Sequence, residues 1–161
     1  MIRHTTYEDI PRLMEIYAYA REFMKQTGNP TQWGDNFPPQ VFLENDVVNG
    51  NGYAMCDDDG RIYATFAFIV GDDPTYKNIY DGAWLDDDPY GTIHRIASDG
   101  THKGVLKTCV SFCEGIIPNL RIDTHNDNKV MQHQIEKNGF TRCGTIYVED
   151  GSPRIAYQRK G

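Results

Sequence analysis

The sequence predicts an α/β (α+β) fold built on a mixed central sheet with helices on both of its faces. Apolar side chains recur every three to four residues in four segments, as in amphipathic helices, and seven shorter segments are rich in β-branched and aromatic residues, as in strands. The segments follow the order β-α-α-β-β-β-α-β-α-β-β. Hairpins near both ends, with β-α-β crossovers between them, indicate a sheet of antiparallel and parallel strands.

The first helix is predicted from capping and periodicity. Thr6 and Asp9 have the spacing of a capping box, and apolar residues then recur at helical steps until Gly28 supplies a stop signal. Three prolines follow in a segment that we expect to be an ordered loop. The predicted elements are a strand over 2–5, a helix that begins at 6–9 and ends at 28, a loop over 29–39 and a helix over 40–48.

Beyond residue 50 the apolar pattern changes to that of strands. The turn Asp57-Asp58-Asp59-Gly60 lies between two apolar runs and predicts a β-hairpin. Lys103 and Gly104 open the third helix, and Asn138-Gly139 ends the fourth. The predicted elements are strands over 53–56, 61–70, 92–98 and 120–123, helices from 103 onward and over 126–138, and strands over 140–148 and 154–159.

Length, composition and charge limit the class of protein. A chain of 161 residues with 39% hydrophobic and 24% charged residues predicts one globular domain over 1–161. The formal net charge is −7, but residues 46–88 carry −8 and residues 89–161 carry +3. This balance argues against non-specific binding of nucleic acid or of an anionic membrane, which needs a broad basic face. A local basic site for a small anion remains open.

The sequence also bears on location and on metal binding. No apolar run reaches the roughly 18–20 residues of a membrane span, and the first residues lack the apolar stretch of a signal peptide, so we expect a cytoplasmic protein. The four cysteines have no Cys-x-x-Cys pair and no histidine at zinc-ligand spacing. We therefore expect no metal site and reduced thiols that pack in the core, at Cys56, Cys109, Cys113 and Cys143.

Several runs of sequence carry a resemblance to a known family. They are Ile-His-Arg-Ile-Ala-Ser-Asp-Gly-Thr-His-Lys-Gly-Val at 93–105, Arg-Ile-Asp-Thr-His at 121–125, Asn-Asp-Asn-Lys-Val-Met at 126–131 with Asn-Gly-Phe at 138–140, and the run at 144–156. With the predicted element order, they make the whole chain resemble the GNAT superfamily of N-acetyltransferases, in its bacterial branch. The resemblance implies a GNAT-like sheet, acetyl-CoA as cofactor and acetyl transfer to an amine.

The resemblance also implies a cofactor site. In this family the strand before the third helix contacts the pantetheine arm, and the following turn and helix start hold the pyrophosphate, which suits free N–H groups and a helix dipole. The positions that correspond here are Ile96, Ala97, Ser98, His102, Lys103, Gly104, Val105 and Leu106, with Asn126 and Asn128 near the next helix. The residues alone also fit an ordinary turn with a solvated lysine. Compared with the family motifs, Thr101 replaces Arg or Gln, Leu106 replaces a small residue, and Ile135 replaces a Tyr that often acts as general acid.

Acetylation needs a group that removes a proton, because a lysine-like amine with a pKa of about 10.4 is almost fully protonated at pH 7. His94 is the first candidate for the base, since it shares side-chain parity with Ile96 on the fourth strand, and His125 is the second. Tyr147 is a candidate proton donor. All three also have structural interpretations, as a hydrogen-bonded histidine, a capping group and a packing residue.

Five residues come from segments that border the acceptor site in the family: Gln32, Trp33, Tyr80, Trp84 and Tyr90. Aromatic faces bind cationic amines, although the same residues fit the anchoring of loops. The acidic runs at 57–59, 72–73 and 86–88 fit turns on the surface. Because these runs lie in the segment of charge −8, we expect a cationic acceptor, either a small molecule or a peptide.

The residues favour direct transfer in a ternary complex, since no Ser-His-Asp or Cys-His pattern lies near the cofactor turn. The main alternative is a catalytically inactive acyl-CoA-binding module, which the altered glycine motif and the missing tyrosine favour. A protein-interaction domain that binds no CoA is a third hypothesis. Homodimers are common in the family, and the sequence leaves this point open.

Overall fold

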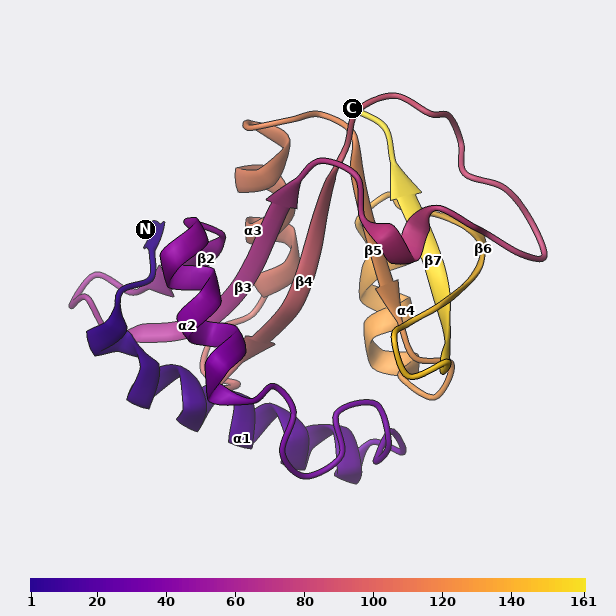
Figure 1. Ribbon diagram of the computed structural model, residues 1–161. Helices are drawn as coiled ribbons and strands as arrows, with labels where there is room; N and C mark the ends of the chain where they lie inside the picture. The colour runs from indigo at the N-terminus through magenta and orange to yellow at the C-terminus, as the bar shows by residue number, and fades with distance from the viewer. The chain divides into compact units, whose positions relative to one another are not determined.

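The computed structural model describes residues 1–161 and contains seven strands and four α-helices in the predicted order (Figure 1). The strands are β1 (Ile2–His4), β2 (Gly52–Cys56), β3 (Ile62–Val70), β4 (Gly91–Ser98), β5 (Leu120–Thr124), β6 (Thr141–Tyr147) and β7 (Pro153–Arg159), and the helices are α1 (Ile10–Gln26), α2 (Gln40–Asn49), α3 (Val105–Glu114) and α4 (Lys129–Lys137). The strand order in the sheet is β1-β2-β3-β4-β5-β7-β6. β5 pairs in parallel with β4 and antiparallel with β7, so the predicted mixed α/β fold is confirmed.

The element boundaries follow the predicted ones within a few residues. At the start of the chain Asp9 accepts a 2.8 Å hydrogen bond from Thr6 N–H, so the capping box is present, and it closes a 3-10 turn from which α1 continues. α4 begins at Lys129 rather than at 126. The Asn128 side chain caps it, accepting a 3.0 Å hydrogen bond from Met131 N–H.

The chain divides into two compact units, and the expectation of one domain stays a prediction. The first unit comprises Met1–Phe68 and His94–Val105. Its core forms where one face of α1 packs against α2 and the strands, because the apolar residues of α1 recur at helical spacing. Its buried members include Leu13, Ile16, Tyr17, Leu43, Ala54, Ile62 and Ala97.

The second unit comprises Ile69–Ile93 and Leu106–Gly161. In Figure 1 α4 lies beside β5 and β7, and the Tyr157 hydroxyl of β7 donates a 3.0 Å hydrogen bond to Glu136 of α4. A second core cluster, which contains Tyr76, Tyr90, Ile146 and Ala156, packs the loop between β3 and β4 against β6 and β7. This long loop is therefore an ordered part of the unit.

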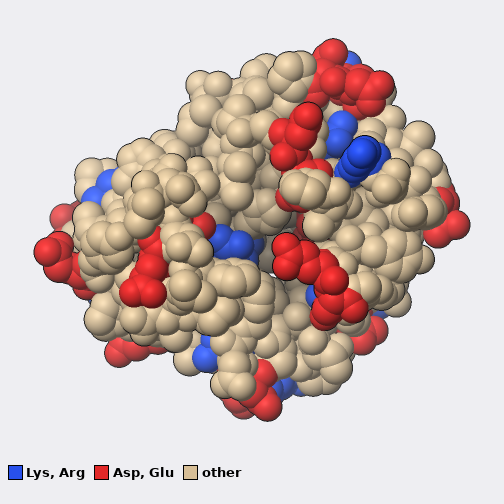
Figure 2. All heavy atoms as spheres, in the orientation of Figure 1, with Lys and Arg blue, Asp and Glu red and all other residues tan.

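The cysteines agree with the sequence-based expectation, and the charges can be followed on one face of the molecule. Cys56, Cys109, Cys113 and Cys143 are all buried and free. Acidic groups lie in several separate patches over the face drawn in Figure 2, and the basic groups there form smaller patches rather than a continuous basic surface. None of the helices has the length and apolar character needed to cross a bilayer.

Candidate active site

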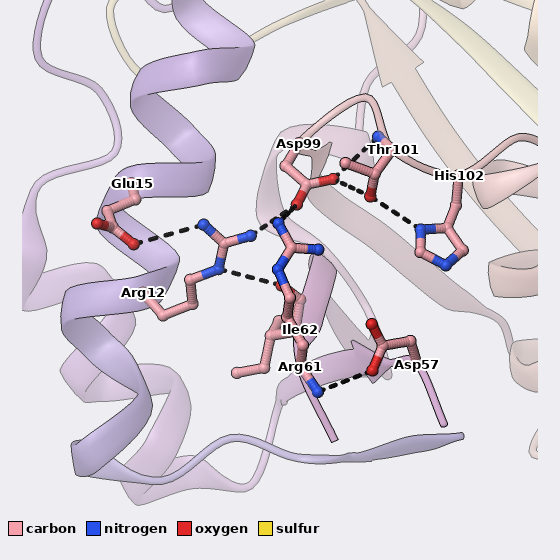
Figure 3. Close-up of polar contacts among 8 residues, drawn as sticks. All are labelled: Arg12, Glu15, Asp57, Arg61, Ile62, Asp99, Thr101 and His102. Atoms are coloured by element: carbon pink, nitrogen blue, oxygen red, sulfur yellow. Dashed lines mark hydrogen bonds and ion pairs between the residues drawn. The ribbon is translucent and has the colours of Figure 1, made fainter. Parts of the chain in front are cut away.

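The turn between β4 and α3, residues 99–104, is held by one largely buried carboxylate. Asp99 accepts a 2.6 Å hydrogen bond from Arg12 Nη2 of α1 and a 2.7 Å bond from Nη2 of Arg61, which directly precedes β3 (Figure 3). Thr101 donates to the same carboxylate through its N–H and its hydroxyl, at 3.0 and 2.6 Å. Burial alone would raise the pKa of Asp99, but the hydrogen bonds from Thr101 and Arg61 outweigh it and lower the pKa, so Asp99 is ionised.

His102 lies on the exposed side of this turn. Its ring stacks on Tyr63 of β3, with ring centroids 3.7 Å apart and planes inclined by 19°. Its Nδ1 lies 2.9 Å from the Thr101 hydroxyl. The ring therefore has a fixed orientation although His102 is exposed to solvent.

Two glycines shape the turn. Gly100 has φ of 80°, and a Cβ there would collide with the Tyr19 hydroxyl. Gly104 has φ of 69°, and no atom lies within 4 Å of the position that its Cβ would take. α3 begins at the next residue, so its first N–H groups, which have no partner within the helix, follow directly on an open, exposed turn. This arrangement suits an anion such as a phosphate group.

The strand that leads into the turn is interrupted at Arg95. This residue has φ of 51°, the left-handed conformation that side chains other than glycine seldom adopt. The regular alternation of side chains is disturbed there, and the shared side of His94 and Ile96, which suggested His94 as the base, stays a prediction. His94, Ile96 and Ser98 are half-buried, while Ala97 packs in the core of the first unit.

The two acceptor-site candidates of the first unit, Gln32 and Trp33, both contact other residues of that unit. Trp33 packs its ring edge-on to Tyr17, with centroids 5.6 Å apart, and it covers the core cluster. Gln32 accepts a 2.7 Å hydrogen bond from the side chain of Asn29, which is almost fully buried. Their roles toward an acceptor stay predictions.

In the second unit, His125 lies in the turn between β5 and α4. Its Nδ1 accepts a 2.9 Å hydrogen bond from Asp127 N–H, which places the proton of the neutral ring on Nε2. Burial and the nearby Arg154 lower the pKa of His125, so the neutral form is favoured. With one nitrogen accepting and the other protonated, the ring suits a hydrogen-bond donor rather than a general base.

The same turn holds the two asparagines that were assigned to the cofactor. Asn128 is buried and caps α4, as described above, so its main visible role is structural. The carbonyl of Asn126 accepts a 2.8 Å hydrogen bond from Gln132 Nε2, which also donates to the carbonyl of His125 at 3.1 Å. These bonds close the turn. A contact of Asn126 or Asn128 with a cofactor stays a prediction.

Tyr147 and Tyr80 form a pair on the surface of the second unit. Their rings meet edge-on with centroids 5.4 Å apart, and about half of each side chain is exposed. The backbone of Tyr80 forms a bridge with Thr145 of β6 through two hydrogen bonds, of 2.9 and 2.7 Å, which fixes the loop at this point. Ile135, at the position of the family tyrosine, is fully buried in α4.

Trp84 and Tyr90 enclose a cation that belongs to the chain itself. The guanidinium of Arg121, on β5, lies 3.9 Å from the centroid of each ring. Arg121 is buried, and its Nη2 donates a 2.9 Å hydrogen bond to the carbonyl of Asp86. Each ring therefore has one face covered by Arg121, and the aromatic attraction for a cation anchors the loop. A contact of either ring with the acceptor stays a prediction.

Sequence reasoning missed the groups that hold the turn at 99–104. They are Arg12 of α1, Arg61 just before β3 and Tyr63 of β3, which meet the turn only after folding, so no local pattern indicates them. Asp99 carries a weak signal, because Asp before Gly is typical of turns. In the structure no group of three or more His, Cys, Asp or Glu side chains is arranged to hold a metal ion.

Comparison with known proteins adds to this geometry. No protein-family model and no curated protein sequence matches the chain. Among solved structures, an acetyltransferase of the GNAT family from Streptococcus agalactiae has 32% sequence identity and a TM-score of 0.86, with 100% of this chain and 95% of that chain covered. A GNAT-family acetyltransferase from Listeria monocytogenes has 18% identity and a TM-score of 0.73, covering 100% and 94%.

A more distant structure contains a cofactor. It is a GNAT superfamily phosphinothricin acetyltransferase from Sinorhizobium meliloti, in complex with AcCoA. It has 13% identity and a TM-score of 0.60, with 99% of this chain and 87% of that chain covered. At this identity the likeness extends to the fold.

Proposed function

The chain belongs to the GNAT family of acetyltransferases, and on that premise we propose that it is an acetyl-CoA-dependent N-acetyltransferase. It transfers the acetyl group directly to a primary amine. The observation that carries the proposal is the open start of α3 behind Gly104, in a chain whose likeness to a family member extends over its whole length. When bound, acetyl-CoA supplies a thioester whose carbonyl carbon is attacked by the amine and whose sulfur leaves as thiolate.

The residues present fit the cofactor. The first N–H groups of α3 offer hydrogen bonds to phosphate oxygens, and no side chain lies over Gly104. Lys103, which forms no ion pair in the structure, adds a positive charge beside them. Ile96, Ala97 and Ser98 of β4 supply main-chain groups for the pantetheine arm. The hydrogen bonds to Asp99 hold the turn in place before the cofactor arrives, which lowers the entropy lost on binding.

The acceptor amine has to lose a proton before it attacks. His94 remains the proposed base, because the hydrogen bond from Asp127 N–H leaves His125 without a free lone pair. His125 is instead proposed as a hydrogen-bond donor through Nε2. Tyr147 is exposed and is the proposed proton donor, since Ile135, at the position of the family tyrosine, is buried and has no proton to donate. A thiolate with a solution pKa of about 8.5 is also able to leave without an acid.

We propose a cationic acceptor, a small molecule or a peptide. Residues 46–88 carry a net charge of −8. Some of these carboxylates have structural roles: Asp57 and Asp73 accept hydrogen bonds from N–H groups of their own turns, and Asp86 binds Lys160. The exposed acids Asp72, Asp87 and Asp88 remain to attract a positive charge. The four cysteine thiols of this chain are free, which suits a reducing compartment, and we propose the cytoplasm.

Two measurements test the proposed function. A thermal-shift titration with CoA should raise Tm, because a ligand that binds only the folded state stabilises it. Initial rates at varied concentrations of acetyl-CoA and amine should give intersecting lines, as expected for a ternary complex. Parallel lines would indicate a covalent acetyl-enzyme and would contradict direct transfer.

The second candidate is an acyl-CoA-binding module without catalysis. It is favoured by Ile135, which is buried where the family often has an acid, and by Leu106, a large buried residue where the motif has a small one. A protein of this kind would show the thermal shift with CoA but would release no thiol from acetyl-CoA with any amine. Loss of both signals would leave an interaction domain as the remaining hypothesis.

A further inference from the structure

Asp99, Thr101 and His102 form a hydrogen-bonded chain that defines the protonation of His102. The ionised Asp99 can only accept, so the Thr101 hydroxyl donates its proton to Asp99 across 2.6 Å. The oxygen of Thr101 must then accept from His102, whose Nδ1 lies 2.9 Å away. Nδ1 therefore carries a hydrogen, and in the neutral ring Nε2 has the lone pair.

The Nε2 atom is left free to meet a ligand. It makes no hydrogen bond in the structure, and in Figure 3 it points away from Asp99 and from the two arginines. Stacking on Tyr63 prevents the ring from turning over. His102 thus presents one free ring nitrogen, in a fixed direction, three residues before α3 begins.

The three cations and three carboxylates around His102 balance each other, which leaves few cations for a phosphate. The charged or titratable groups around it are Arg12 and Glu15 on α1, Asp57, Arg61 and Tyr63 on the hairpin, and Asp99 and Lys103 in the turn. Arg12 and Arg61 are both bound to Asp99. Lys103 is therefore the one cation of the turn without an acidic partner, and Thr101 replaces the Arg or Gln of the family motif.

From this geometry we propose that His102 binds a phosphate group of the cofactor and takes up a proton at Nε2 when it does so. The imidazole accepts the proton from solvent, and the resulting N–H donates to a phosphate oxygen. Asp99 and Thr101 act as positioning residues that fix the ring. The inference rests on the proposed function, because it needs CoA to bind at this turn.

Isothermal titration with CoA near pH 7, in two buffers of different ionisation enthalpy, tests the inference. The difference between the measured enthalpies gives the number of protons taken up. The wild-type protein should take up a fraction of a proton per CoA. H102Q should bind about tenfold more weakly, the loss expected for one charge-assisted hydrogen bond, and should take up none. T101V keeps the shape of Thr101 and should lose part of the affinity while proton uptake persists.

H133Q is the matched control, since His133 is an exposed histidine on α4 that makes no contact comparable to that of His102. It should bind CoA and take up protons as the wild type does. Equal affinity and uptake in H102Q and the wild type would overturn the inference while the proposed function stands. If the wild type bound no CoA, the proposed function itself would fail.

A titration with 3′-dephospho-CoA shows which phosphate is bound. Proton uptake that persists with this ligand places His102 on the pyrophosphate, and proton uptake that disappears places it on the 3′-phosphate.

Discussion

The Tyr17 hydroxyl donates a 2.7 Å hydrogen bond to the main-chain carbonyl of Arg95. Burial raises the pKa of Tyr17, so this hydroxyl keeps its proton under all physiological conditions. The Arg95 guanidinium binds both oxygens of Asp46 on α2, at 2.7 and 2.9 Å. α1 and α2 thus hold the one residue of β4 that adopts a left-handed conformation.

The conformation of Arg95 can be tested with two variants that lose the same guanidinium. R95N places a residue that tolerates φ near 50°, whereas R95V places a β-branched residue that does not. R95V should therefore have a lower free energy of unfolding than R95N, by about 1–2 kcal/mol, which corresponds to a few degrees in Tm. Equal thermal unfolding of the two variants would show that the left-handed conformation is not required.

The cofactor turn is tested by G104E. The new carboxylate would stand where the pyrophosphate is proposed to bind, so CoA should no longer raise Tm. G151E is the control, because Gly151 also has a positive φ, of 83°, with open space around it, but lies in the turn between β6 and β7. Both variants should lose similar stability, and G151E should still bind CoA. Unchanged CoA affinity in G104E would refute the placement of the turn.

Acid unfolding should depend on Asp86. The hydrogen bond from Lys160, with further ones from Gln158 and Asp88, lowers the pKa of Asp86 to about 2. Because the folded-state pKa is the lower one, the stabilisation is present above pH 4 and is lost as the pH falls from about 4 to 2. The Tm of D86N should therefore fall less steeply between pH 4 and pH 2 than the Tm of the wild type. D87N, which changes an exposed neighbour, should show the same dependence of Tm on pH as the wild type. An equal dependence in D86N would contradict the role of Asp86.

The aromatic clamp on Arg121 is tested by R121K. Lysine keeps the charge but has no flat group to lie between Trp84 and Tyr90. With two desolvated cation–π contacts weakened, the free energy of unfolding should fall by about 2 kcal/mol and Tm by about 4–8 °C. R142K, at an exposed arginine of β6, should leave Tm within about one degree. Equal Tm values for R121K and R142K would show that the clamp does not stabilise the loop.

The role of His94 is read from pH–rate profiles. If His94 is the base, H94A should lose the limb of the profile in which the rate rises with pH as the imidazole becomes neutral. H125Q should retain that limb, because the Nδ1 of His125 is already engaged. A profile of H94A that matches the wild type would exclude His94 as the base.

The elements of the fold were predictable because their signals are local. The capping box at Thr6 and Asp9, the turn at Gly60 and the stop at Gly139 each act over a few residues, and the predicted order is the observed one. The ends of two helices differ by two to three residues from the predicted ones: α1 ends at Gln26 and α4 begins at Lys129. Only the structure shows that Asn128, rather than Asn126, caps α4.

The site was less predictable because its geometry depends on distant residues. The carboxylate of Asp99 meets Arg12, which is 87 positions earlier in the chain, and no local pattern reports that contact. Trp84 and Tyr90 were predicted to contact the acceptor, which stays a prediction, and nothing in the sequence shows that the two rings enclose Arg121. The break at Arg95 is likewise invisible, since arginine has no preference for a left-handed conformation.

The central claim is acetyl transfer to an amine, and one measurement tests it most directly. The wild-type protein is incubated with acetyl-CoA and a panel of cationic, neutral and acidic primary amines, while free thiol and the masses of the amines are followed together. We predict thiol release that depends on a cationic amine, with an equal amount of that amine gaining one acetyl group. Stable binding of CoA without thiol release or acetylated product for any amine would contradict the account.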